Sequence, residues 1–128
     1  MGVELEPRTY RVTRADLVAY AAASGDHNPI HSDEDVALSV GLPGVIAHGM
    51  YTLALAARYV DETLGEPGRI AELAAKFTKP VVVPAGAEGT EVSISGVREN
   101  RDGVESVALT VTCGGDKVLG NPRAVLRG

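Results

Sequence analysis

The sequence predicts a single α+β domain in which a long apolar helix precedes an antiparallel β-sheet. Residues 46–64 are apolar on almost every side of a helix, and their first charge is Arg58, which is typical of a helix buried on several sides. After this segment the hydrophobic residues recur with a period of two, which indicates strands with one buried face. The 128 residues are enough for one domain with a core of its own, placed at 1–128.

The part of the chain before the long helix is predicted to hold a short strand and two shorter helices. Residues 8–12 alternate and form the expected strand. A helix should follow, because Thr13 and Asp16 have the spacing of a capping box and Gly25 would end it. Residues 32–38 read as a second short helix with acidic residues in its first turn.

The part after the long helix is predicted to form the sheet. Turn-forming residues separate four segments with strand character, namely 73–79, 91–95, 104–113 and 117–126. The last segment contains Asn121-Pro122, and proline has no N–H to donate to a neighbouring strand. We therefore expect this strand to be an edge strand, bulged or short.

Composition excludes several classes of function. The net charge of −5 and the pI near 5.1, with basic residues scattered along the chain, argue against a nucleic-acid surface. Cys113 is the sole cysteine, so no internal disulfide is expected, and we interpret it as a small buried hydrophobe. No apolar run reaches the length of a membrane span and the first residues lack a signal-peptide pattern, which predicts a cytoplasmic protein without membrane contact.

The most informative stretch lies between the two predicted helices and reads Ser-Gly-Asp-His-Asn-Pro-Ile-His over 24–31. The Asn-Pro dipeptide favours a turn, so Asp26 and His31 should be bent toward each other. Such a pair suits acid–base chemistry, because an imidazole titrates near neutral pH and a carboxylate can orient it. Downstream, Gly49 lies where the long helix begins, and a glycine there lets a substrate oxygen approach a backbone N–H.

This stretch, together with Ala-His-Gly-Met over 47–50, resembles the hydratase motif of the MaoC-like (R)-specific enoyl-thioester hydratases and dehydratases. It is most similar to the catalytic beta subunits of the mycobacterial-type (3R)-hydroxyacyl-acyl-carrier-protein dehydratases, because the likeness continues through 41–50. The resemblance implies a hot-dog fold, in which an antiparallel sheet wraps around a central helix. It also implies reversible syn addition of water to a trans-2-enoyl thioester, giving a (3R)-3-hydroxyacyl thioester in fatty-acid metabolism.

The resemblance assigns roles to individual residues. Asp26 and His31 would be catalytic through one shared water molecule, and the Gly49 N–H would bind the thioester oxygen. Asn28 and Pro29 are expected to support the loop. Three further residues are candidates for supporting the catalytic pair or for the pocket wall: Ser24, His48 and Tyr51. For His48 a capping or packing role is an equally good interpretation, and His27 occupies the variable position of the motif.

Partners and alternatives follow from the same resemblance. The substrate would be an acyl thioester of coenzyme A or of acyl carrier protein, and the working form would be a homodimer or a heterodimer with a related hot-dog subunit. We expect no cofactor, because no nucleotide-binding motif is present, and no metal, because the acidic residues at 33–35 fit a helix first turn. Two other functions stay open: a non-catalytic partner subunit of a heteromeric dehydratase, and a hot-dog acyl thioesterase.

Overall fold

The computed structural model describes residues 2–127 and contains one antiparallel sheet in the strand order β1-β3-β4-β6-β2, with the short β5 paired to β4. The strands are β1 (Gly2–Val12), β2 (Ile70–Phe77), β3 (Thr90–Arg101), β4 (Val104–Cys113), β5 (Asp116–Lys117) and β6 (Leu119–Leu126). The helices are α1 (Arg14–Ser24), the 3₁₀ turn η1 (Pro29–His31), α2 (Glu34–Ser39) and α3 (Gly49–Leu64). The predicted α+β arrangement of one long helix and an antiparallel sheet is therefore confirmed.

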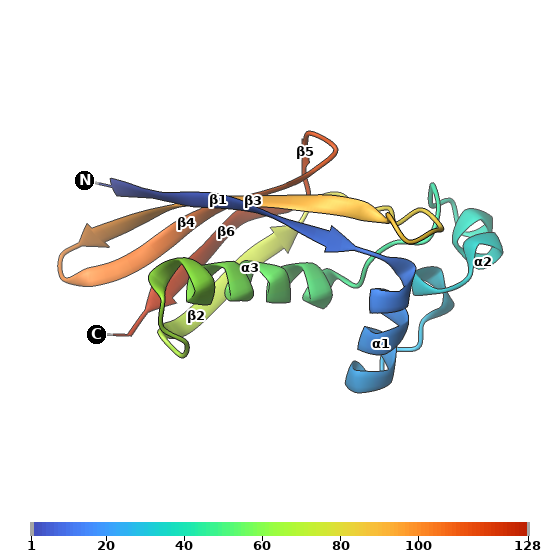
Figure 1. Ribbon diagram of the computed structural model, residues 1–128, viewed down its shortest axis with the longest axis horizontal. Coiled ribbons are helices and arrows are strands. Elements are labelled where there is room, and N and C mark those ends of the chain that lie inside the picture. Colours follow the sequence, from blue (N-terminus) through green and yellow to red (C-terminus); the bar gives the residue numbers. More distant parts are fainter. Residues whose placement is uncertain (1, 128) are drawn as a thin grey trace.

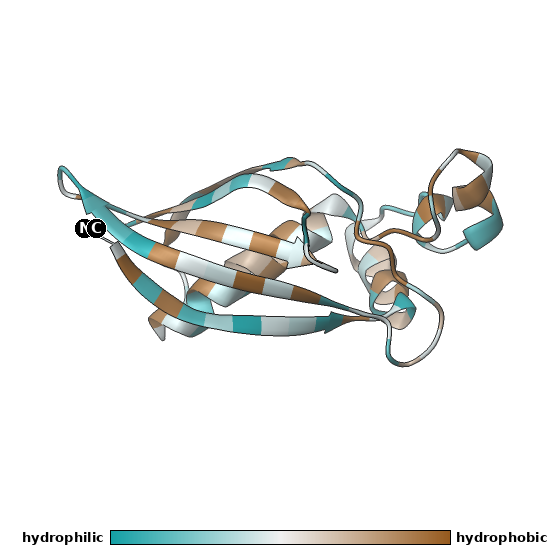
Figure 2. Ribbon diagram, turned by 90° about the horizontal axis from the view of Figure 1, so that it is seen from above, coloured by the Kyte–Doolittle hydropathy of each residue, from teal (hydrophilic) through white to brown (hydrophobic). Residues whose placement is uncertain are grey.

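Helix α3 lies along one face of the curved sheet, and α1 and α2 extend beyond one end of it (Figure 1). Both ends of the chain lie at the opposite end of the sheet. The core forms between α3 and the sheet, where Tyr59 and Val60 of the helix and Val92 and Val107 of the strands are fully buried. Hydrophobic and hydrophilic residues alternate along the strands (Figure 2), as a sheet with one covered face requires.

The predicted caps of α1 are present. The Thr13 hydroxyl accepts a hydrogen bond from the Asp16 N–H, and the Asp16 carboxylate accepts one from the Thr13 N–H. Gly25 ends the helix in the left-handed conformation with φ of 80°. A side chain with a Cβ disfavours this conformation. The glycine therefore fixes the point at which the chain leaves α1 and enters the loop of residues 25–31, called the motif loop below.

The long helix differs from its prediction in two ways. It begins at Gly49 rather than near residue 46, because Ile46 forms a β-bridge with Val82 and the Ala47 N–H donates to the Val81 carbonyl (2.9 Å). Its predicted burial on several sides is also wrong, since an exposed stripe runs along it through Met50, Ala54 and Arg58.

β1 and β3 are several residues longer than predicted, because pairing between strands extends them past the alternating segments, and β2 begins three residues earlier than predicted, at Ile70. β1 begins at Gly2, not residue 8, and pairs with β3 over its whole length with a shift in register between Leu5 and Arg8. β3 continues to Arg101 for the same reason.

Asn121-Pro122 occupies a bulge in β6, one of the three expected outcomes. The pairing of β6 with β2 shifts in register next to this dipeptide, and Asn121 has a φ of 47°. β6 is an interior strand, since β4 and β2 flank it. Across residues 2–127, no helix has the length and apolar character that crossing a bilayer would require.

Candidate active site

The motif loop is held by hydrogen bonds between residues close in sequence. The Ser24 hydroxyl accepts from the Asp26 N–H, and the Asp26 carboxylate accepts from the Asn28 N–H, both at 3.2 Å. The Asn28 side-chain oxygen accepts from the Ile30 N–H, also at 3.2 Å. The loop therefore has a defined conformation although Asp26 itself is exposed to solvent.

His31 lies at the end of the 3₁₀ turn that Pro29 opens, and its side chain is buried, with 9% of its surface exposed. Its Nδ1 donates to the Ile46 carbonyl at 2.7 Å, because a carbonyl oxygen can only accept. The Ile46 N–H in turn donates to the Ile30 carbonyl (3.2 Å), which ties the loop to the segment before α3. In the neutral ring, Nε2 of His31 therefore carries the lone pair and can take up a proton.

His48, the residue immediately before α3, contacts both predicted catalytic residues. Its Nε2–H donates to the backbone carbonyl of Asp26 at 3.1 Å. Its ring stacks on that of His31, with 3.8 Å between centroids and 24° between planes. The ring is buried, and its Nδ1 has no hydrogen-bond partner among residues 2–127.

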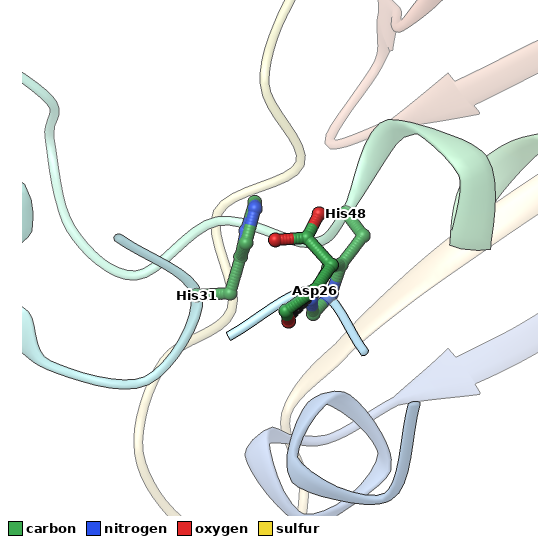
Figure 3. Close-up of side chains that lie close together, drawn as sticks. All are labelled: Asp26, His31 and His48. Atoms are coloured by element: carbon green, nitrogen blue, oxygen red, sulfur yellow. Dashed lines mark hydrogen bonds between the residues drawn. The ribbon is translucent and has the colours of Figure 1, made fainter. Parts of the chain in front are cut away.

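The side chains of Asp26, His31 and His48 lie close together, as Figure 3 shows. A carboxylate oxygen of Asp26 and one ring nitrogen each of His31 and His48 all lie within 4.8 Å of one another. These residues do not fit a bound metal ion. An imidazole lone pair lies in the plane of its ring, so two stacked rings cannot both direct a lone pair at an ion about 2 Å from each.

Two tyrosines pack behind His48. The Tyr20 ring lies 4.8 Å from the His48 ring and 5.4 Å from that of Tyr51, with an edge-on contact between the two tyrosines. Burial raises the pKa of Tyr51, and the nearby Asp16 carboxylate adds to this effect while Arg58 opposes it. Tyr51 is thus a protonated packing residue at neutral pH.

A cavity of about 320 Å³ opens beside His31. The start of α3 contributes Gly49 and Thr52 to its wall, and most of the remaining lining is apolar. A Cβ at position 49 would lie 3.0 Å from the ring of Phe77, so only glycine fits here without displacing that ring. A larger cavity of about 430 Å³, next to Lys117 and Asn121, has no carboxylate or imidazole in its lining.

His31 also borders a second cavity, of about 290 Å³, between α1 and the loop. This cavity is mostly apolar and is lined by Val18 and Ala22 of α1 together with His27 and Asn28. His27 thus lines a cavity with His31 but is not part of the cluster of Asp26, His31 and His48.

One residue of the site was not among the sequence candidates. Thr52 is buried and lines the cavity with His31 and Gly49. The signal that would have indicated it is its position three residues after Gly49, which places both on one side of a helix.

The fold and the site define a class of protein: a single domain with a sheet packed on a long helix, in which an imidazole at an apolar cavity lies close to a carboxylate. Residues 2–114 match the family described as MaoC like domain, and the chain belongs to this family. The family predicted from the motif is therefore confirmed.

Relatives and solved structures agree with this assignment. The chain is 42% identical over 77 residues to 3-hydroxyacyl-thioester dehydratase X of Mycobacterium tuberculosis, an alignment that covers 60% of this chain and 26% of that protein. A solved MaoC-like dehydratase superposes with a TM-score of 0.93 at 38% identity, covering 99% of this chain and 40% of the other. The (R)-hydratase from A. caviae involved in PHA biosynthesis superposes with a TM-score of 0.84 at 25% identity, covering 98% and 94%.

These superpositions confirm the hot-dog fold. The chain spans about a quarter of the length of the curated M. tuberculosis relative and two fifths of the solved MaoC-like dehydratase.

Proposed function

We propose that the chain catalyses the reversible hydration of trans-2-enoyl thioesters to (3R)-3-hydroxyacyl thioesters in fatty-acid metabolism. The observation that carries the proposal is the approach of the Asp26 carboxylate and a His31 ring nitrogen to within 4.8 Å. His31 of this pair lines a cavity whose wall is otherwise mostly apolar, which suits an acyl chain. The named activities of the relatives, a dehydratase of 3-hydroxyacyl thioesters and an (R)-hydratase, support the same reaction class.

In the proposed mechanism, Asp26 and His31 hold one water molecule between them. During hydration the pair removes a proton from this water as its oxygen bonds to C3, and the C2–C3 π electrons move toward the thioester carbonyl. The pair then delivers a proton to C2 on the same face, which completes syn addition. Dehydration reverses each step. His31 can act through Nε2 because its Nδ1–H is already bonded to the Ile46 carbonyl.

The negative charge that develops on the thioester oxygen during the reaction needs a hydrogen-bond donor to stabilise it. We assign this role to the backbone N–H of Gly49, the first residue of α3, because the first-turn N–H groups of a helix have no partner within the helix. The positive end of the helix dipole adds to the stabilisation. One such preorganised donor contributes about 3 kcal/mol to catalysis.

The remaining predicted residues act in this proposal by holding the pair in place. Ser24 and Asn28 fix the loop backbone around Asp26, and Pro29 starts the turn that delivers His31. His48 contacts the Asp26 carbonyl and the His31 ring, and Tyr51 supports His48 through Tyr20. The proposed site thus consists of a catalytic pair, one hydrogen-bond donor to the thioester oxygen and a set of residues that hold the pair in place.

The substrate carrier in the proposal is coenzyme A or acyl carrier protein, and the working form is a pair of hot-dog units, either two copies or this chain with a related subunit. β2 lies at one edge of the sheet, and Phe77 at its end is 58% exposed while it lines the cavity. A partner strand along β2 would cover this ring and close the cavity mouth. Light scattering of the purified chain should give the mass of a dimer, and a monomer that is fully active would overturn this part.

The main experiment follows the loss of enoyl-thioester absorbance with crotonyl-CoA and with a longer trans-2-enoyl-CoA. Asp26→Asn and His31→Gln should each lower turnover at least about 100-fold, as expected for the loss of a general acid or base. Asp35→Asn on α2 and His27→Gln in the same loop are matched controls that should keep activity. If both active-site variants hydrated the substrate as fast as the wild type, the mechanism would be refuted.

Two further measurements separate the two other functions. Release of free thiol from an acyl-CoA without loss of the enoyl group by hydration would identify a thioesterase. A folded wild-type chain that turns over neither enoyl-CoA and raises the activity of a related hot-dog subunit would identify a non-catalytic partner.

A further inference from the structure

Thr52 is a buried polar residue of the cavity for which the mechanism above has no use. It lies in the first turn of α3, three residues after Gly49, and only 4% of its surface is exposed. It lines the same cavity as His31 and Gly49. Thr52 and Gly49 are therefore neighbours on the side of α3 that faces the candidate substrate site.

The hydroxyl of Thr52 lacks the partner that a helical threonine normally has. Threonine in a helix commonly donates to a carbonyl three or four residues earlier, and Thr63 of the same helix does so, bonding the Tyr59 carbonyl at 2.8 Å. The Thr52 backbone N–H donates to the His48 carbonyl at 3.2 Å, whereas its hydroxyl takes part in none of the side-chain hydrogen bonds of residues 2–127. The hydroxyl oxygen is not among the fully buried atoms without a partner, so in a residue of the cavity wall it is accessible from the cavity. A hydroxyl that is accessible from a cavity and unused by the fold is free to donate a hydrogen bond to a molecule bound there.

The direction of helical side chains shows where in the cavity this hydroxyl lies. A Cα–Cβ bond in a helix tilts toward the N-terminus, so the Thr52 side chain lies over the turn that begins at Gly49. We propose that the Thr52 hydroxyl donates a hydrogen bond to the carbonyl oxygen of a bound acyl thioester, beside the N–H of Gly49. This inference rests on the proposed function for the identity of the substrate. It makes the oxyanion site a two-donor site, one donor from the backbone and one from a side chain.

Turnover tests the proposal through variants that differ only at the hydroxyl. Thr52→Val keeps the volume and branching of the side chain and removes the donor, and it should lower kcat at least about tenfold with little change in KM. Thr52→Ser keeps the donor and should stay within about threefold of wild type. Thr63→Val is the matched control, because that hydroxyl is already bonded within α3. Thr52→Val with unchanged kcat overturns the proposal.

A second measurement reports on the carbonyl without turnover. Butyryl-CoA labelled with ¹³C at the thioester carbonyl cannot be hydrated, and hydrogen bonding to its oxygen lowers the carbonyl stretching frequency in a difference infrared spectrum. The wild type and Thr63→Val should lower this frequency more than Thr52→Val does. Equal frequencies in all three, or no shift in the wild type, overturn the proposal. Should Thr52→Val unfold, Thr52→Ala against Thr52→Ser gives the same comparison.

The two measurements separate this inference from the proposed function. A wild type that polarises butyryl-CoA in a Thr52-dependent way but hydrates no enoyl thioester supports the Thr52 contact and refutes the hydratase. A wild type that hydrates crotonyl-CoA while Thr52→Val matches it in both kcat and carbonyl frequency supports the hydratase and refutes the contact.

Discussion

The imidazole rings of His31 and His48 are stacked, with 3.8 Å between their centroids. His31 comes from the motif loop and His48 from the residue before α3, so the stack joins two segments that are distant in the sequence. The second contact of His48, from Nε2 to the Asp26 carbonyl, joins the same two segments. His48 thus contacts both members of the proposed catalytic pair without itself lining the 320 Å³ cavity.

We expect His48→Phe to lower turnover about tenfold while the free energy of unfolding stays the same or rises. Phenylalanine keeps a ring against His31 but cannot donate to the Asp26 carbonyl, so the loop loses one anchor. It also removes Nδ1, which is buried without a partner among residues 2–127. Steady-state kinetics and urea unfolding check the two halves of this prediction.

His48→Ala is the matched comparison, because it removes the ring as well as the hydrogen bond. The cavity left behind should cost about 2–4 kcal/mol of stability, which urea unfolding measures. A His48→Phe variant with wild-type kcat would contradict a positioning role for the hydrogen bond.

The sequence was sufficient for the parts of the site that depend on local chemistry. The Asn-Pro turn and the Gly25 cap act over a few residues, so the approach of Asp26 and His31 followed from residue types alone. The stack of His31 on His48 did not, because it depends on the hydrogen bonds that tie Ile46 to the loop across fifteen residues. A contact between residues this far apart along the chain leaves no periodic pattern in the sequence.

The same division applies to the fold: local features were predictable from the sequence, and features that depend on distant segments were not. The capping box and the glycine at the end of α3 placed helix ends correctly, since caps are local features. The start of α3 was misplaced because Ile46 and Ala47 continue the apolar run of the helix in the sequence. Only their contacts with the segment at 81–83 make them extended. β1 was cut short because pairing with β3, rather than its own pattern, carries it back to Gly2.

Gly49→Ala should lower kcat/KM at least about tenfold while changing stability by less than about 1 kcal/mol. The added methyl group would meet the Phe77 ring at 3.0 Å and narrow the approach to the backbone N–H. The fold tolerates the change, because Phe77 is 58% exposed and can turn aside. Gly44→Ala is the control, since a Cβ there meets Val82 at an ordinary 3.4 Å. Equal losses of activity in the two variants would argue against a special role for Gly49.

Gly25→Ala and Gly65→Ala form a matched pair. Both glycines end a helix at positive φ, 80° and 75°, and in both places a Cβ would meet nothing within 4 Å. Each alanine should therefore cost about 1 kcal/mol of stability through backbone strain alone. Only Gly25→Ala should also lower kcat, because Asp26 is the next residue and its loop departs from that cap. Thermal unfolding and kinetics on both proteins measure the difference, and similar kcat values would contradict the link between cap and loop.

The lowered pKa of Glu62 leads us to expect a pH dependence of stability that does not involve the candidate active site. Its carboxylate accepts from the Tyr10 hydroxyl at 2.6 Å and from Arg58 at 3.1 Å. The hydrogen bond from Tyr10, followed by that from Arg58, lowers the pKa of Glu62 below its ordinary value of 4.5. Because the folded-state pKa is the lower one, the carboxylate stabilises the fold above the unfolded-state value, and this contribution is lost as the pH falls through the folded-state pKa.

The variant Glu62→Gln keeps an acceptor for Tyr10 but cannot ionise. We expect its Tm to lie below that of the wild type at neutral pH and the gap to narrow as the pH falls below the unfolded-state pKa, closing once the pH is below the folded-state pKa. Glu72→Gln is the control, because that exposed carboxylate has no ion pair within residues 2–127, and its Tm difference should stay flat. A gap for Glu62→Gln that stays constant down to acid pH would mean that the carboxylate stabilises the fold by packing rather than by its charge.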